Sequence, residues 1–254
     1  MDSFKILFSN LGYARGIDGS LWHHVSRIGR HVYCPVPPQQ FVLSQLKQIM
    51  LQEKPELCCF VEIDQGSLLS SNFNQMEALR DDDYCYHDIS NKYGADSWLS
   101  RLPFHTSKSN GFLAKSAYQF RRLYFKAGRK RLIYQIILPG DIALYFAHFS
   151  LNAQTRREQF IEMIDHMKHD NTHSVLLADF NIFNGFPELD PLLKGTDMRI
   201  MNRDNEPTFR FHKKRHILDL ALCSESLIGR VELKVIPQPY SDHAALFLKV
   251  NGEA

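Results

Sequence analysis

The 254-residue chain has no long apolar run, no strong excess of charge of one sign and no even number of cysteines. Its five cysteines are an odd number, and Cys58 and Cys59 lie inside an apolar run, so we expect buried free thiols in a reducing, cytoplasmic compartment rather than a disulfide framework. No apolar run approaches the length of a membrane span, and the first residues lack the layout of a signal peptide. The net charge is +2, so any attraction to phosphate must come from local clusters.

The motifs of several large enzyme classes are also missing. The sequence has no Gly-x-Ser-x-Gly elbow, no Gly-Lys-Ser/Thr phosphate loop and no dinucleotide fingerprint, which argues against a serine hydrolase, an NTPase and a nicotinamide enzyme. It also has no linker-like tract and no internal repeat, so we predict one domain over residues 1–254. A hydrophobic content of 44% is enough for a full core.

Apolar patterning predicts more strands than helices. Strands are expected at 4–8, 57–61, near 111–114, and at 132–138, 142–149, 175–178, 217–222, 231–236 and 244–250. Helices are expected at 42–50, around 69–76, and after a capping box formed by Thr155 and Glu158. The segment 22–38, with three prolines, is expected to be irregular. This order favours an α+β fold of two packed sheets flanked by helices over a doubly wound parallel sheet.

Polar side chains recur at or beside the ends of these strands. Burying a carboxylate or an imidazole there costs several kcal/mol unless the group is paired or binds a metal. Carboxylate and amide oxygens suit Mg²⁺ or Mn²⁺, and the remaining acids and histidines suit proton transfer and phosphate binding. The residues in this pattern are Asn10, Glu62, His148, Asp179, Asn181, Asp219, Asp242 and His243.

This ordered set resembles the signature of the endonuclease/exonuclease/phosphatase superfamily, over residues 4–250. The sequence LADFN corresponds to the family's Gly-Asp-x-Asn with Ala178 in place of the glycine, and LDLAL corresponds to its Asp-Tyr. Gly12, where abasic-site endonucleases usually carry Asp, and the presence of His148 place the chain closer to the DNase, sphingomyelinase and tyrosyl-DNA phosphodiesterase branches. The resemblance implies a four-layer α/β/β/α sandwich of two mostly antiparallel sheets.

The resemblance also implies roles for the strand-end residues. It implies that Glu62, with Asn10 and Asp242, holds the Mg²⁺ or Mn²⁺ ion. The remaining implied roles are catalytic. Asp179, with Asn181, would position or deprotonate the attacking water. His243, oriented by Asp219, would contact the phosphate or move its proton, and His148 would stabilise the transition state.

Two windows are rich in basic residues. The first, over 121–131, is better explained as a solvated strand edge, although aromatic residues interleave with it. The second, over 210–216, runs into Asp219 and is equally compatible with a phosphate-binding surface. We take Lys214 and Arg215 from this window, together with Arg156, as candidate contacts to the substrate phosphate.

We therefore predict a divalent-metal-dependent phosphoesterase that hydrolyses a phosphodiester by direct attack of water. Nucleic acid is the favoured substrate, and a phospholipid or an inositol phosphate is the alternative. An exposed apolar loop would favour the lipid, and the only candidate is the segment 33–38. A groove of aromatic and arginine side chains would favour nucleic acid. A binding module that has lost activity is least favoured, because the metal ligands and the base are all present.

Overall fold

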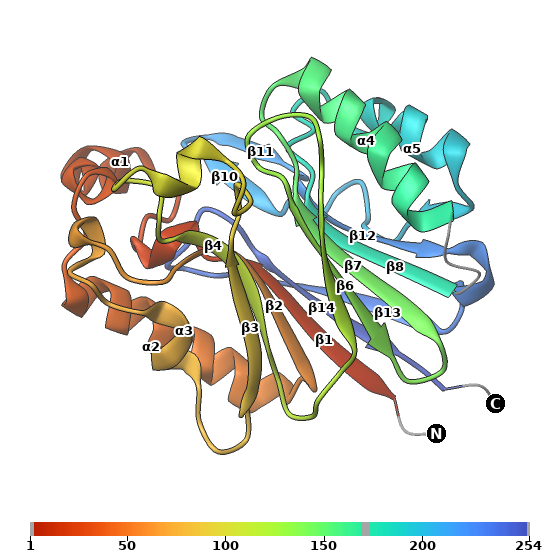
Figure 1. Cartoon of the computed structure of the whole chain (residues 1–254), viewed down its shortest axis with the longest axis horizontal. Helices are drawn as coiled ribbons and strands as arrows, with labels where there is room; N and C mark the ends of the chain where they lie inside the picture. The colour runs from red at the N-terminus through yellow and green to blue at the C-terminus, as the bar shows by residue number, and fades with distance from the viewer. Residues whose placement is uncertain (1–2, 169–172, 253–254) are drawn as a thin grey trace.

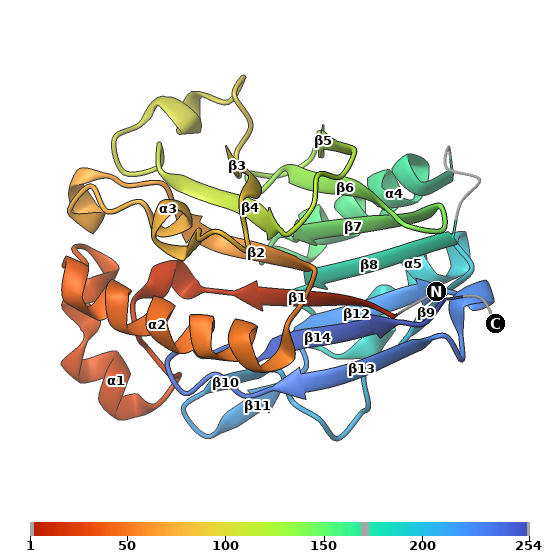
Figure 2. The same ribbon diagram turned by 90° about the horizontal axis from the view of Figure 1, so that it is seen from below.

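The computed structural model describes residues 3–168 and 173–252. Two six-stranded sheets face each other, and helices cover their outer faces (Figures 1 and 2). The first sheet has the order β13 (Val231–Ile236), β14 (Ala245–Val250), β1 (Phe4–Asn10), β2 (Leu57–Asp64), β4 (Lys108–Ala114), β3 (Tyr86–Asn91). The second has the order β5 (Phe120–Tyr124), β6 (Leu132–Leu138), β7 (Ile142–His148), β8 (His173–Asp179), β12 (Asp219–Ser224), β9 (Met198–Ile200). This arrangement confirms the predicted α/β/β/α sandwich.

The helices lie in two outer layers. Those packed on the first sheet are α2 (Val36–Glu53) and α3 (Gln75–Leu79), with α1 (Leu21–Ser26) at one end. Those packed on the second sheet are α4 (Ala153–Lys168) and α5 (Asp190–Gly195). A two-stranded hairpin, β10 (Phe209–Phe211) and β11 (Lys214–His216), stands outside both sheets. Short 3-10 turns occupy Gly12–Ala14, Ile28–His31, Leu68–Ser70, Trp98–Arg101, Phe186–Leu189 and Glu225–Leu227.

Three apolar clusters hold these layers together. The central cluster fills the space between the sheets. It includes Phe8 and Phe112 from the first sheet and Tyr134 and Phe146 from the second. The alternation of strand side chains accounts for this, because every second residue points inward. The other two clusters lie under α2 and α3 and under α4 and α5. Burying one large apolar side chain contributes about 1.5–3 kcal/mol, so the three clusters make a rigid frame for the strand ends.

Each sheet contains one parallel pair at its centre. Strands β1 and β2 are parallel and are connected through α2, and β7 and β8 are parallel and are connected through α4. The other pairs in the two sheets are antiparallel. Because parallel strands finish at the same edge, these two pairs bring four of the predicted polar residues to one end of the sandwich.

Two local predictions are wrong. The segment 22–38 is not irregular throughout, because α1 forms within it and α2 begins at Val36. The prolines at 37 and 38 lie in the first turn of α2, where backbone N–H groups need no helical partner. Helix α4 begins at Ala153, and Asn152 rather than Thr155 caps it, since Asn152 Oδ1 accepts the Thr155 N–H at 3.0 Å.

Four of the five cysteines are buried, as predicted for Cys58 and Cys59 from their apolar run. Cys34, Cys58, Cys59 and Cys223 are buried free thiols, and Cys85 is an exposed one. Among the described helices, none combines the length and the apolar content needed to cross a lipid bilayer.

Candidate active site

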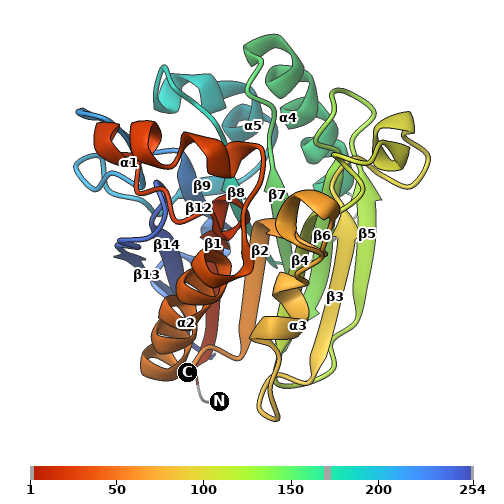
Figure 3. The same ribbon diagram turned by 90° about the vertical axis from the view of Figure 1, so that its left-hand side faces the viewer.

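The predicted polar residues gather where the central strands of both sheets end. Asn10 and Glu62 come from β1 and β2, and His148 and Asp179 end β7 and β8. These strand ends lie at the same end of the sandwich as α1 and the β10–β11 hairpin (Figures 1 and 3). Asp219 begins β12 directly opposite Asp179 in the register, and Asp242 and His243 directly precede β14. The structure thus joins residues that are more than 200 positions apart in the chain, as the 3.4 Å approach of Asn10 Nδ2 to His243 Nε2 shows.

Asp179 is the most heavily constrained of these carboxylates. Its Oδ2 accepts from Asn10 Nδ2 at 3.0 Å and lies 3.1 Å from His148 Nε2, and its Oδ1 accepts the Asn181 N–H at 3.1 Å. Burial acts to raise the pKa of Asp179, but His148, His243 and Lys130 outweigh it and hold that pKa well below its usual range. The side chain is therefore an oriented carboxylate at neutral pH.

His243 and Asp219 form a buried ion pair. Nδ1 of His243 lies 2.7 Å from Oδ2 of Asp219. Burial lowers the pKa of His243, but the carboxylates of Asp219 and Asp179 raise it to about 10, whereas burial raises the pKa of Asp219 to about 7. The proton accordingly resides on the imidazole, and its Nε2 faces Asn10. This arrangement presents a cationic N–H to the site.

Glu62 lies at an irregularity in strand β2. The register of β2 against β4 shifts between Phe60 and Ile63, and Glu62 has φ of 54°, so its side chain leaves the regular alternation of the sheet. Its Oε1 lies 3.1 Å from Nζ of Lys92 and 3.7 Å from Nδ1 of His148. Burial acts to raise the pKa of Glu62, but Lys92, His148 and Lys130 hold it well below the usual range. Glu62 is thus an anion that faces cations.

Two lysines at the site were not singled out by the sequence. Nζ of Lys92, a residue only 3% exposed, contacts the hydroxyl of Tyr13 as well as Glu62. Nζ of Lys130 contacts Nε2 of His148, and burial lowers the pKa of Lys130 to about 8. The N–H groups of Arg131 and Leu132 donate to the Lys92 carbonyl at 2.8 and 3.2 Å, so two backbone hydrogen bonds hold the segments of both lysines together.

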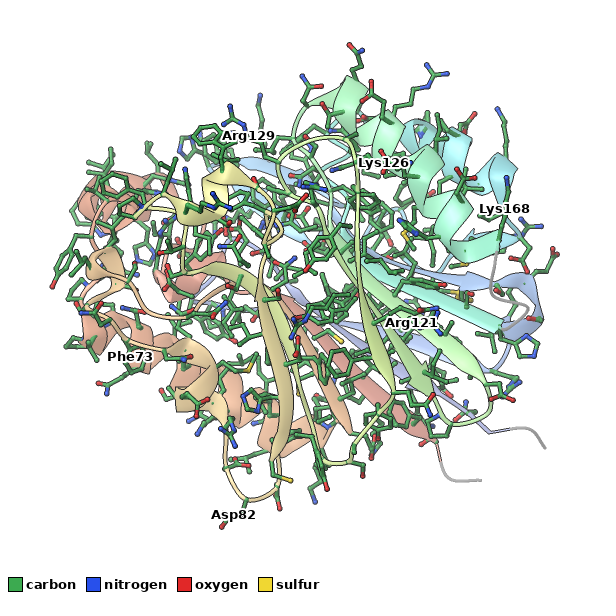
Figure 4. The ribbon with its side chains drawn as sticks, viewed as in Figure 1. Phe73, Asp82, Arg121, Lys126, Arg129 and Lys168 are labelled. Atoms are coloured by element: carbon green, nitrogen blue, oxygen red, sulfur yellow. The ribbon has the colours of Figure 1, made fainter. Side chains whose placement is uncertain are left out.

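Lys130 belongs to the first basic window, which was interpreted as a solvated edge. That interpretation describes Arg121, Lys126 and Arg129, which are exposed at the surface (Figure 4). Lys130 differs because it lies in the turn before β6, next to His148 at the end of β7. The only signal in the sequence was a lysine beside the start of an apolar strand.

The donor set suits a divalent cation on the Glu62 side of the site. Burial raises the pKa of Asp242, and the negative charge of Glu62 raises it further, so a cation between these carboxylates would relieve both penalties. In the described part of the chain, Nδ1 of His148 and Oδ1 of Asp219 are buried without a hydrogen-bond partner. Ligand atoms of Asp179, Asp219 and His243 also lie within 4.8 Å of one another. We favour the Glu62 side, because His243 already uses Nδ1 to hold Asp219.

Comparison with solved structures identifies the fold. An endonuclease/exonuclease/phosphatase family protein from Leptotrichia buccalis superimposes with a TM-score of 0.68 at 18% identity, over 98% of this chain and 100% of that one. Humanized D. rerio TDP2 gives 0.63 at 14% identity, over 98% and 99% of the two chains. The endonuclease domain of TRAS1, a telomere-specific non-LTR retrotransposon, gives 0.60 at 11%, over 99% and 100%. The chain has the endonuclease/exonuclease/phosphatase fold. No protein-family model and no curated protein matches its sequence.

On this endonuclease/exonuclease/phosphatase frame, Arg156 is not available as predicted. The side chain is 2% exposed and pairs with Glu188, and its guanidinium also donates to the carbonyls of Ser150 and Leu151 at 2.9 and 3.1 Å. These bonds fix the loop after β7 to the turn before α5. Arg156 therefore positions the loop that follows His148, and we do not carry it forward as a phosphate contact.

The second basic window borders a groove beside His243. The groove has a volume of about 510 Å³, and Phe209, Arg210 and Arg215 of the β10–β11 hairpin line it together with Asp242 and His243. The ring of Phe209 lies 4.8 Å from that of His243. Lys214, next to Arg215, is exposed on the same hairpin. Aromatic and arginine side chains thus line one wall of the opening to the site.

Proposed function

We propose that this chain is a divalent-metal-dependent phosphodiesterase that acts by direct attack of water. The observation that carries the proposal is the arrangement around Asp179. One carboxylate, oriented by Asn10 and Asn181, faces His148 on one side and the His243–Asp219 pair on the other. Neutral and cationic donors around an oriented base are what phosphoester hydrolysis requires.

Asp179 is the residue best placed to accept the proton of the attacking water. Its low pKa keeps it ionised, and three contacts fix the direction of its oxygens. His148 would hold a phosphate oxygen as a neutral donor, since burial lowers its pKa to about 4. His243 would donate its Nε2 proton to a phosphate or leaving-group oxygen, while Asp219 keeps the imidazole in place.

Three residues would hold the metal ion, which we propose is Mg²⁺ or Mn²⁺. Glu62 and Asp242 supply carboxylate oxygens, and Asn10 supplies Oδ1, which also accepts the Gly12 N–H at 3.0 Å. When bound, the ion supplies Lewis-acid neutralisation of the charge that builds on the phosphate. Lys92 and Lys130 add fixed positive charge on the same side.

The groove beside His243 favours nucleic acid as the substrate. Arg210 and Arg215 can pair with backbone phosphates, and Phe209 offers a ring for base stacking. The structural similarity to an endonuclease domain, that of the telomere-specific retrotransposon TRAS1, supports this direction.

A phospholipid is the second candidate, because exposed apolar side chains lie close to the site. Of these side chains only Tyr33 belongs to the segment 33–38, and the others precede it, at residues 21–32. A lipid substrate would require the site to face a membrane surface, whereas a nucleic acid would use the basic groove.

One assay separates these substrates. The purified protein should be incubated with Mg²⁺ or Mn²⁺ and DNA, RNA, sphingomyelin, inositol phosphates or the soluble diester bis(p-nitrophenyl) phosphate, with a chelator control. We expect chelator-sensitive hydrolysis of a diester that Asp179→Ala abolishes. If no substrate is hydrolysed, or if Asp179→Ala keeps full activity, the proposed function is wrong.

A further inference from the structure

Large apolar side chains are concentrated on one exposed segment, residues 21–33. They range from 52% exposed for Tyr33 to 74% for Trp22. A contiguous exposed patch of this kind indicates a binding surface, whereas scattered apolar side chains do not. We call this segment the apolar surface segment, and its exposed members are Leu21, Trp22, Val25, Ile28, Val32 and Tyr33.

Exposure separates the two sides of the segment. Leu21, Trp22 and Val25 of α1 are exposed, whereas His23 and His24 are half-buried. The helix ends at Ser26, and the 3-10 turn that follows exposes Ile28 in the same way. Figure 1 shows α1 at one end of the molecule, where these apolar side chains do not contribute to the core.

The inward side of α1 is anchored by polar and aromatic contacts. Nδ1 of His23 lies 2.8 Å from Oδ1 of Asp18, and the ring of His24 packs against those of Phe211 and His212 at 5.0 and 5.2 Å. These contacts hold the segment to the β10–β11 hairpin. The apolar side chains of the segment are therefore presented by a folded element rather than by a loose loop.

The charge around the segment is positive. Residues 12–35 contain Arg15, Arg27 and Arg30 but a single acid, Asp18, which is paired with His23. One small cleft beside the segment is lined by three basic residues, Arg15, Arg30 and Lys108, by one buried acid, Asp64, and by the apolar side chains of Val32 and the 61% exposed Phe104. Helices that lie in a membrane interface combine Trp, Leu and other apolar side chains with arginines beside them, which suits anionic head groups. Proteins that track single-stranded nucleic acid use aromatic stacking and basic side chains rather than a run of exposed aliphatic residues.

We infer that the apolar surface segment docks the protein onto an anionic lipid surface, with Trp22 and its neighbours in the head-group region. The docking does not depend on which phosphoester the site hydrolyses. Its position matters nonetheless, because the Gly19 carbonyl accepts the His212 N–H at 2.6 Å and ties the start of the segment to the groove hairpin. A docked molecule would hold its active site next to the membrane.

Vesicle binding tests this inference. Wild-type protein should be sedimented with vesicles of phosphatidylcholine alone and of phosphatidylcholine mixed with phosphatidylglycerol, without metal. We expect binding to the mixed vesicles, and we expect the double variant Trp22→Ser, Ile28→Ser to bind at least about tenfold more weakly. Ile161→Ser is the matched control, because Ile161 is 50% exposed on α4, away from α1 (Figure 1).

Three readouts make the outcome decisive. The double variant should keep the wild-type melting temperature and the rate on bis(p-nitrophenyl) phosphate, and Asp179→Ala should bind vesicles as the wild type does. Failure of the wild type to bind mixed vesicles overturns the inference but leaves the proposed function intact. It is equally overturned if the double variant instead abolishes a dimer seen by light scattering, or loses affinity for DNA while still binding vesicles.

Discussion

The two parallel strand pairs end in different ways, although each is connected through one outer helix. The pair β7–β8 ends in register, with His148 opposite Asp179, and both side chains are 2% exposed and lie 3.1 Å apart. The pair β1–β2 also stays in register to its end, but Asn10 lies opposite Val61, and Glu62 follows one residue later, where the register of β2 against β4 shifts. The Glu62 side chain is 21% exposed and turned toward Lys92.

This difference fits the two proposed tasks. The closed end would fix the proposed base and its partners away from bulk water, which strengthens their electrostatic interactions. A bulged, half-open end leaves a carboxylate that can exchange a lysine contact for a metal ion and its waters. We therefore expect substitutions at the closed end to affect the chemical step and those at the open end to affect metal binding.

The largest effect should come from the closed end. Asp179→Ala removes the proposed base, and we expect kcat on the best substrate to fall about 10²–10⁴-fold with little change in KM. Steady-state kinetics measure both. Asp190→Ala, on the exposed surface of α5, is the control and should keep wild-type kinetics. A KM effect as large as the kcat effect would mean that Asp179 binds substrate rather than activating water.

Lys130 should come next, because its ammonium contacts His148 at the closed end. Lys130→Met removes one positive donor, and we expect kcat to fall about 10²-fold. Lys126→Met, in the same turn but exposed, should have no effect. Equal rates for the two variants would mean that Lys130, like Lys126, does not contribute to the reaction, as the solvated-edge interpretation of this window predicts.

Glu62→Gln should weaken metal binding at the open end. Loss of one carboxylate ligand should lower Mg²⁺ affinity at least about tenfold, as measured by calorimetric titration, and excess Mn²⁺ should restore part of the rate. Glu77→Gln, an exposed glutamate on α3, is the control. Unchanged metal affinity in Glu62→Gln would contradict this assignment and would favour metal binding by Asp179, Asp219 and His243 instead.

The smallest effect concerns pH and stability, and it has opposite signs for the two histidines. The pKa of His243 is raised to about 10, so its contribution to the free energy of unfolding is fully present below the unfolded pKa of about 6.5 and is lost as the pH rises through 10. The pKa of His148 is lowered to about 4, so its contribution is present above about 6.5 and is lost as the pH falls through 4.

Urea unfolding of the wild type, His243→Gln and His148→Gln across this range measures both contributions. The difference between the wild type and His243→Gln should shrink toward high pH, and the difference for His148→Gln should shrink toward low pH. Parallel curves for the two variants would contradict the assigned protonation states.

The structure brings the strand-end residues that the sequence indicates to one end of the sandwich, and this grouping has a physical reason. A carboxylate beside a buried run, as at Asp179 or Glu62, has few stable environments, so its presence already indicates a partner or an ion. The sandwich followed from the order of apolar runs. Lys92 and Lys130 could not be found this way, because their positions depend on turns between strands. The sequence does not predict that α2 begins at Val36, because prolines usually interrupt helices. Prolines are tolerated in the first turn of a helix, which is where Pro37 and Pro38 lie.

Gly19, two residues before the apolar surface segment, lies directly against the chain that carries Asp242. A methyl group at this position would come within 2.0 Å of the Arg210 carbonyl oxygen and 3.1 Å of Asp242 Cβ, and the residue has φ of +74°. No larger residue fits here unless the two backbones separate. If α1 binds a surface, a displacement of α1 would therefore reach the proposed metal ligand Asp242 through this backbone contact, so that surface binding and metal affinity would be coupled at Gly19.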